Sequence, residues 1–200
     1  MKETNLQVKR KKRGPKTTDS NHALPRYPNL AKETDVQQVN QVWVADITYI
    51  ACRGVFFYLA LILDLFSRKI VGWELSRDID AGLTLAALEK AARERETQGC
   101  IHHSDHGVQY LSAAYMDKLH KLGMLPSMGE IGNSYDNAFA ESLNKTVKNE
   151  EVWINEYDSF AHAYESIAQY IETYNNERLH SSIGYVPPEE YEQLNGAKVL

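Results

Sequence analysis

Hydrophobic and polar residues alternate in the segment QVWVADITYI, which spans residues 41–50. Successive side chains of an extended strand point to opposite faces of a sheet, so this alternation predicts a strand. One face would carry Trp43, Ala45, Ile47 and Tyr49, and the other would carry Val42, Val44, Asp46, Thr48 and Ile50. Asp46 is therefore an acid within a face that is otherwise suited to burial.

The next two apolar segments predict further strands. Residues 55–63, VFFYLALIL, are apolar on both faces, which is typical of a central strand covered on both sides. Residues 69–75, KIVGWEL, follow after a short turn in DLFSR. Because the breaks between these segments are short, with four residues (ACRG) in the first, we expect an antiparallel three-stranded meander.

Helical and strand-like segments alternate in the second half of the chain. A helix capped by Asp78 or Asp80 is expected to end before Gly99. CIHHS, 100–104, predicts a short strand with Asp105 at its tip, and MLPSM, 124–128, predicts an edge strand. Further helices are expected over about 111–122, 134–148 and 158–176, and the end, RLHSSIGYVPPEEY, is interpreted as a loop. The elements together predict an α/β fold with a mixed five-stranded sheet flanked by helices.

The first 40 residues differ in character from the rest. They show little periodicity and contain several breakers, so we interpret 1–40 as a basic tail or linker, 41–192 as one core, and 193–200 as a second tail. Residues 1–16 hold seven Lys or Arg and one acid, which leaves 15 basic and 26 acidic side chains elsewhere. The tail could contact phosphates or serve as a solvated linker. The acidic body disfavours coating of nucleic acid by charge alone, but it permits an enzyme that reaches phosphates through metal ions.

Other composition features exclude several protein classes. The sequence contains no run of about 18 apolar residues, so no membrane span is predicted. The basic N-terminal segment lacks the apolar region of a secretory signal. The two cysteines, Cys52 and Cys100, provide neither a disulfide framework nor a metal quartet, and free thiols in a reducing cytoplasm are expected.

Three acids stand out as candidate metal ligands. Asp46 lies within a strand, Asp105 ends another strand, and Glu141 lies in the predicted helix NAFAESLNKTVK. If the two strands are adjacent, all three carboxylates can converge, and their mutual repulsion would require a divalent cation. Hard oxygen ligands and a phosphate substrate favour Mg²⁺ or Mn²⁺, and two such ions could assist an in-line displacement at phosphorus. Each acid alone could equally be a surface or capping residue.

Five segments of the chain resemble the integrase catalytic core of IS3-family bacterial transposases. They are WVADITYI, ALILDLFSRKIVGWELS, IHHSDHGVQY, GNSYDNAFAESLNKTVKNE and YNNERLHSSIGYVPPEEY, which together cover about residues 40–192. Asp105 and Glu141 have 35 residues between them, as in the D,D(35)E pattern of that family and of retroviral integrases. The resemblance implies a ribonuclease H-like fold, with Asp46, Asp105 and Glu141 as catalytic metal ligands. It also implies metal-dependent cleavage of a DNA 3′ end, followed by strand transfer.

The resemblance also implies partners and a cellular location. The partners would be the terminal inverted repeats of the element and the target DNA, and a homo-oligomer is expected because transposition joins two ends. The expected location is the bacterial cytoplasm, in association with the nucleoid, without a membrane.

Several polar residues near the three acids are candidate DNA contacts. Lys145 and Lys148 follow Glu141 by four and seven residues, so all three share one face of a helix. Gln109 and Tyr110 follow the Asp105 turn. Asn137 belongs to the family pattern Gly-Asn-x-x-Asp-Asn, in which Gly132, Asn133 and Asp136 also match. Solvated lysines and a helix cap at Asp136 are the alternative interpretations.

Some features leave other functions open. His102, His103 and His106 lack nearby cysteines, which disfavours a structural zinc site. His106 stands where relatives commonly have Arg, so a phosphate contact there is in doubt. Relatives usually carry an upstream helix-turn-helix region, whereas this chain begins in what resembles the linker. A catalytically silent, truncated remnant that binds DNA or partner subunits is the main alternative, and a general nuclease of the same fold is a weaker one.

Overall fold

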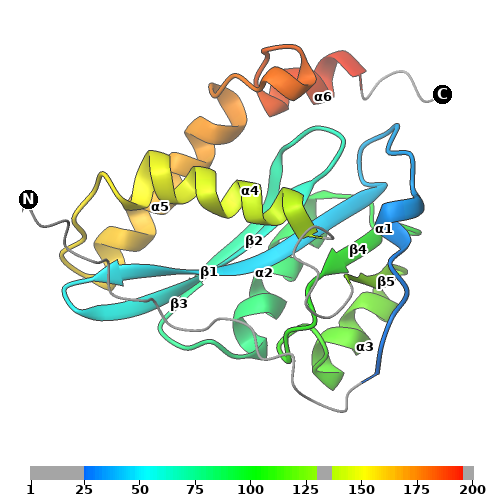
Figure 1. Cartoon of the computed structure of the whole chain (residues 1–200), viewed down its shortest axis with the longest axis horizontal. Coiled ribbons are helices and arrows are strands. Elements are labelled where there is room, and N and C mark those ends of the chain that lie inside the picture. The colour runs from blue at the N-terminus through cyan, green and yellow to red at the C-terminus, as the bar shows by residue number, and fades with distance from the viewer. Residues whose placement is uncertain (1–24, 130–136, 196–200) are drawn as a thin grey trace, which may run out of the picture.

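The computed structural model describes residues 25–129 and 137–195, and these form a sheet covered by helices on both faces (Figure 1). The strands are β1 (Val42–Cys52), β2 (Val55–Asp64), β3 (Ile70–Ser76), β4 (Ile101–Ser104) and β5 (Leu125–Met128). The helices are α1 (Leu30–Glu33), α2 (Ala81–Glu94), α3 (Ala113–Lys121), α4 (Ala138–Val147), α5 (Phe160–Asn176) and α6 (Pro188–Asn195). A π-helical turn, η2 (Lys148–Val152), continues α4, and a 3₁₀ turn, η3 (Ser181–Ile183), precedes α6.

The five-stranded mixed sheet has the order β3-β2-β1-β4-β5, which confirms the predicted fold class. β1, β2 and β3 form the expected antiparallel meander, and β4 pairs with β1 and β5 in parallel. The first hairpin turn is shorter than the predicted four residues, because Arg53 and Gly54 alone connect β1 and β2 with positive φ angles of 44° and 89°. β2 is an interior strand, as expected, while β1 occupies the middle of the sheet.

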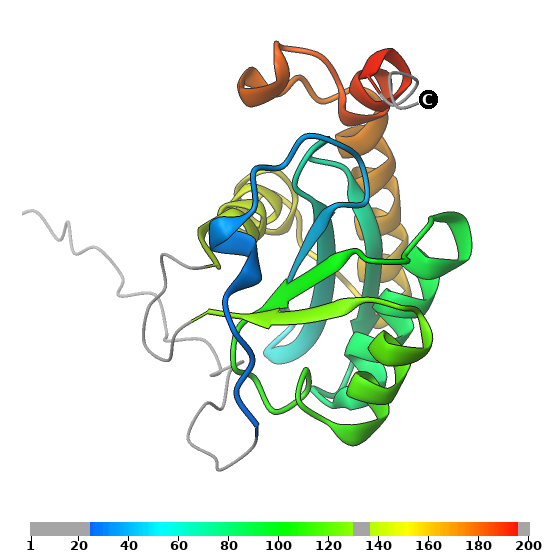
Figure 2. The same ribbon diagram turned by 90° about the vertical axis from the view of Figure 1, so that its right-hand side faces the viewer.

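Each face of the sheet buries its own hydrophobic cluster. Side chains of α4 and α5 pack on one face against the even-numbered residues of β1, such as Val44 and Ile50. α2 and α3 cover the other face, where they meet Trp43, Ala45 and Ile47. The alternation read from the sequence therefore assigns these β1 residues to the correct faces. Figure 2 shows the two helical layers on either side of the strands.

Local sequence signals explain where the helices begin. Asp80, one of the two predicted caps, accepts a hydrogen bond from the Leu83 backbone N–H at 3.0 Å. α2 then packs closely on β3, because a Cβ on Gly72 would lie 2.4 Å from the Ala87 carbonyl oxygen.

Two predicted segments differ from the structure. The end of the chain was expected to be a loop, but α6 begins at Pro188, because proline is well suited to the first turn of a helix. The helix expected from residue 134 is described only from Ala138, and its predicted start lies outside the described residues.

The predicted domain boundaries at 40 and 192 remain a prediction. Within the predicted tail, the short helix α1 contacts β5, since the backbone N–H of Leu30 donates to Ser127 Oγ at 2.9 Å. α6 extends to Asn195, three residues past the predicted end of the core.

Candidate active site

Asp46 and Asp105 are brought together by the pairing of β1 with β4. The parallel register runs from Val42 opposite Ile101 to Ala45 opposite Ser104. Asp46 and Asp105 are the next residues on the two chains, at a position where neighbouring strands lie about 4.8 Å apart. Both therefore lie at the point where the pairing between β1 and β4 ends.

Glu141 reaches this point from the helix above it. α4 packs on the face of β1 that carries Asp46, and Asn144 of α4 donates its Nδ2 to Asp46 Oδ2 at 2.7 Å. Glu141 precedes Asn144 by three residues and lies on the same side of the helix. Glu141, Asn144, Lys145 and Lys148 all line one hollow of about 360 Å³ together with Asp46.

The three acids interact electrostatically. Burial, followed by the negative charge of Asp105, raises the pKa of Asp46 to about 7, and Glu141 adds to this effect. Hydrogen bonds from the Ile47 backbone N–H and from Asn144 oppose the shift. Within residues 25–129 and 137–195, however, no three His, Cys, Asp or Glu side chains are placed closely enough to hold a metal ion.

The turn after β4 fixes Asp105. The Gly107 backbone N–H donates to Asp105 Oδ1 at 3.0 Å. A Cβ at Gly107 would lie 3.0 Å from the same oxygen, so the absence of a side chain there lets the carboxylate fold back on its own turn.

The two predicted lysines both lie beside the acids, but in different surroundings. Lys145 is exposed, whereas Lys148 is half-buried and its Nζ lies 4.1 Å from the centre of the Tyr49 ring. Burial lowers the pKa of Lys148, and the charge of Asp46 opposes that change. The predicted helix face is thus present, with Lys148 held over an aromatic ring.

The other predicted DNA contacts lie deeper. Gln109 and Tyr110 are only 8% and 3% exposed, so neither side chain is open to DNA in this arrangement. Asn137 is also buried and donates its Nδ2 to the Ala45 carbonyl oxygen at 3.2 Å, which ties the start of α4 to β1. Gly132, Asn133 and Asp136 lie outside the described residues.

The histidines near Asp105 are internal hydrogen-bonding groups. His102 Nε2 lies 2.9 Å from the Tyr115 hydroxyl, and His103 Nδ1 lies 2.8 Å from Ser127 Oγ. Burial lowers the pKa of His102 to about 3, so its ring is neutral at physiological pH.

Sequence reasoning did not single out Asn144, Tyr49 or Trp153, which also line the hollow. Asn144 could have been found, because it follows Glu141 by three residues on the helix. Tyr49 was assigned to the opposite face of the sheet, and no periodic signal marked Trp153.

Comparison with known protein families identifies the chain. The integrase core domain family matches residues 36–134, and a second integrase core domain family matches residues 122–188. The transposase of insertion sequence IS629 from Shigella sonnei is 37% identical over 184 residues, and that of IS904 from Lactococcus lactis is 40% identical over 171. Transposase InsF of insertion sequence IS3A from Escherichia coli is 36% identical over 177 residues. The chain belongs to the IS3 family of insertion-sequence transposases.

The transposases that it matches are longer than this chain. The IS629, IS904 and IS3A matches cover 92%, 84% and 87% of this chain, but 62%, 68% and 62% of those transposases. Among solved structures, the HTLV-2 integrase catalytic core domain in complex with magnesium superposes with a TM-score of 0.61 at 16% identity. That match covers 79% of this chain and 97% of the integrase core, which confirms the ribonuclease H-like fold.

Proposed function

We propose that this IS3-family domain cleaves DNA 3′ ends and transfers them to a second phosphodiester in a metal-dependent reaction. The observation that supports the proposal is the position of Asp46 and Asp105 at the end of the β1–β4 register, beneath the helix that carries Glu141. Like charges held near one another are costly for a fold unless a cation offsets their repulsion.

The chemistry of the three acids suits Mg²⁺ or Mn²⁺, although in this structure they are not close enough together to hold one ion. All three groups are carboxylates, which these cations prefer. The raised pKa of Asp46 reflects burial first and the repulsion by Asp105 and Glu141 second, and a divalent charge would offset both. We assign Asp46, Asp105 and Glu141 as the residues that would hold the metal, which we take to be two ions. When bound, such ions activate the attacking oxygen and stabilise the leaving oxygen.

The chain's own residues would prepare this site. Asn144 and the Ile47 backbone N–H would orient the Asp46 carboxylate toward a bound cation. Gly107 fixes Asp105 through its N–H. Lys145 and Lys148 would contact the DNA backbone next to the acids.

We further propose that the element ends and the target DNA are the substrates, and that two or more copies act together. The expected location remains the bacterial cytoplasm with the nucleoid. Across residues 25–129 and 137–195, no helix is long and apolar enough to span a membrane.

A joining assay tests the function. The chain would be incubated with labelled, pre-cleaved DNA ends and a plasmid target in Mn²⁺ and then Mg²⁺, beside Asp105→Asn and Glu141→Gln. We expect joined products with the parent only. A parent that binds divalent ions and DNA but never joins them would instead support the silent remnant.

A further inference from the structure

The hollow beside Asp46 and Glu141 has an aromatic rim. Tyr49 of β1 and Trp153, just after η2, line it together with the two acids and the two lysines. Trp153 is 56% exposed, although a large apolar ring gains free energy from burial. The ring therefore stands at the mouth of the candidate active site and offers surface to a ligand.

The π-helical turn η2 aligns Trp153 with the active face of α4. Glu141, Asn144, Lys145 and Lys148 recur at helical spacing on that face, and a continuous α-helix would place Val152 next. Instead, the Trp153 backbone N–H donates to the Lys148 carbonyl oxygen at 2.8 Å, five residues back. Because the π-helical turn holds one more residue than an α-helical turn, Val152 is buried and Trp153 takes the next position on the helix face that carries Lys148. Such turns are frequent at functional sites.

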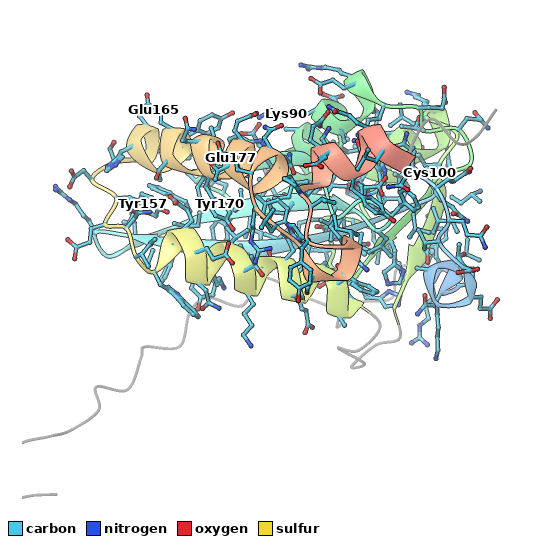
Figure 3. The ribbon with its side chains drawn as sticks, turned by 90° about the horizontal axis from the view of Figure 1, so that it is seen from above. Lys90, Cys100, Tyr157, Glu165, Tyr170 and Glu177 are labelled. Atoms are coloured by element: carbon cyan, nitrogen blue, oxygen red, sulfur yellow. The ribbon has the colours of Figure 1, made fainter. Side chains whose placement is uncertain are left out.

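Hydrogen bonds from α5 and the segment before it hold the turn η2 in place. Glu151 is buried and accepts a hydrogen bond from the Tyr157 hydroxyl at 3.0 Å, and Glu150 accepts one from the Tyr170 hydroxyl at 3.0 Å. Figure 3 shows Tyr157 and Tyr170 between α5 and the helix formed by α4 and η2. Arg178 adds two hydrogen bonds to Glu150, at 2.6 and 2.7 Å. The position of Trp153 is thus set by packing on the far side of the turn.

Tyr49 lies where the edge of β1 is open. β4 pairs with β1 only from Val42 to Ala45, so in the described structure the following residues of β1 pair with β2 alone. The Tyr49 ring meets Lys148 Nζ at this edge and packs edge-on against Phe56, with ring centres 5.4 Å apart. These contacts hold the Tyr49 ring in one orientation and keep Lys148 beside the hollow.

From this arrangement we propose that Trp153 and Tyr49 form a stacking platform for unpaired bases at the end of the DNA strand. The proposal rests on the proposed function and names the form of DNA that the same site accepts. A nucleotide carries a phosphate, which suits Lys145 and Lys148, and a flat ring, which suits the aromatic rim. The faces of a base inside a duplex are covered by its neighbours, so an unpaired base offers these rings far more surface than a paired one.

A binding experiment tests the platform without chemistry. Two duplexes of one sequence, labelled at the far end, would be titrated with the full chain in Ca²⁺, one blunt and one with three mismatched terminal pairs. We expect tighter binding of the frayed duplex, by about tenfold, and loss of most of this preference in Trp153→Ala. Affinity for the blunt duplex should change less than twofold, and Trp153→Phe should keep part of the preference.

Ile154→Ala is the matched control, since Ile154 is 71% exposed beside Trp153 but has no aromatic face. It should retain the parental preference. Frayed DNA should also quench tryptophan fluorescence in the parent but not in Trp153→Phe. Of the other two tryptophans, Trp43 is fully buried, and Trp73 packs against Lys90 and Tyr164 and does not line the hollow.

The outcomes separate the two proposals. An unchanged preference in Trp153→Ala, or an equal loss in Ile154→Ala, would overturn the platform while leaving DNA binding intact. A parent that binds neither duplex would contradict the proposed function itself.

Discussion

Asp46→Asn is expected to stabilise the metal-free protein near pH 8. Burial disfavours ionisation of the Asp46 carboxylate, and the negative charges of Asp105 and Glu141 add to this cost. Asparagine keeps the shape and removes the charge. Among the described residues Asn144 Oδ1 has no hydrogen-bond partner, so a turned amide of Asn144 could accept a bond from the new side chain.

The magnitude follows from the pKa shift. A rise from 3.8 to about 7 corresponds to at most about 4 kcal/mol at high pH, since each unit is worth about 1.36 kcal/mol. Asp46 is partly exposed, and solvent screening reduces the expected gain to about 1–2 kcal/mol. For a domain of this size that gain corresponds to a Tm increase of about 2–8 °C.

The sign of the pH dependence is fixed by the same shift. Because the pKa of Asp46 is raised in the folded state, the folded protein binds more protons than the unfolded chain between about pH 4 and pH 7. The contribution of Asp46 to stability is therefore complete below about pH 4 and is lost as the pH rises through 7. The advantage of Asp46→Asn should be largest at pH 8 and should vanish near pH 4.

Thermal and urea denaturation with a chelator, at pH 8 and at pH 4, would measure the difference. Asp64→Asn is a matched control with the opposite expectation. Asp64 is fully buried, and burial raises its pKa as well, but its carboxylate accepts backbone hydrogen bonds from Asn40, Phe66 and Ser67. An amide there loses an acceptor and should destabilise by about 1–3 kcal/mol. A lower stability of Asp46→Asn than of the parent at pH 8, or a gain in stability that is the same at pH 8 and pH 4, would refute the reasoning.

Three further substitutions test other parts of the account. Gly107→Ala should weaken Mg²⁺ stabilisation of the fold, measured as the Mg²⁺ midpoint of the Tm shift, because its Cβ crowds Asp105 Oδ1; an unchanged midpoint would contradict the role of this turn. Lys148→Ala should weaken DNA binding regardless of sequence and lower the salt slope of log K by about 1, measured by anisotropy between 50 and 200 mM salt; an unaltered slope would exclude a phosphate contact. Gly72→Ala should cost more than about 2 kcal/mol by urea unfolding, because its Cβ would meet the Ala87 carbonyl oxygen at 2.4 Å; a neutral result would argue against the close packing of α2 on β3.

The sequence alone could predict much of the sheet and its acids. Strand alternation gives the face of Asp46, and the short apolar run before Asp105 gives a strand tip, because both patterns depend on local backbone geometry. The helix spacing of Glu141, Lys145 and Lys148 is local in the same way. Asp46, Glu141, Lys145 and Lys148 line one hollow.

Other features depend on contacts that no local pattern encodes. A 3.6-residue period cannot predict a π-helical turn. The place of Trp153 beside the hollow depends on its backbone hydrogen bond to the Lys148 carbonyl oxygen, which the sequence pattern does not show. The side-chain position of Tyr49 depends on where β4 stops pairing with β1, which is a tertiary property. Gln109 and Tyr110 have polar groups that suit DNA, yet the packing of the turn after β4 buries them.

The central claim is that Asp46, Asp105 and Glu141 converge on a divalent cation. Fe²⁺ in place of Mg²⁺ would test this most directly, since ascorbate and peroxide then generate radicals that cut the chain beside the bound metal. We predict cuts mapped by mass spectrometry near residues 46, 105 and 141, suppressed by excess Mg²⁺ and absent in Asp105→Asn. Cuts elsewhere, or the same cuts in Asp105→Asn, would contradict the account.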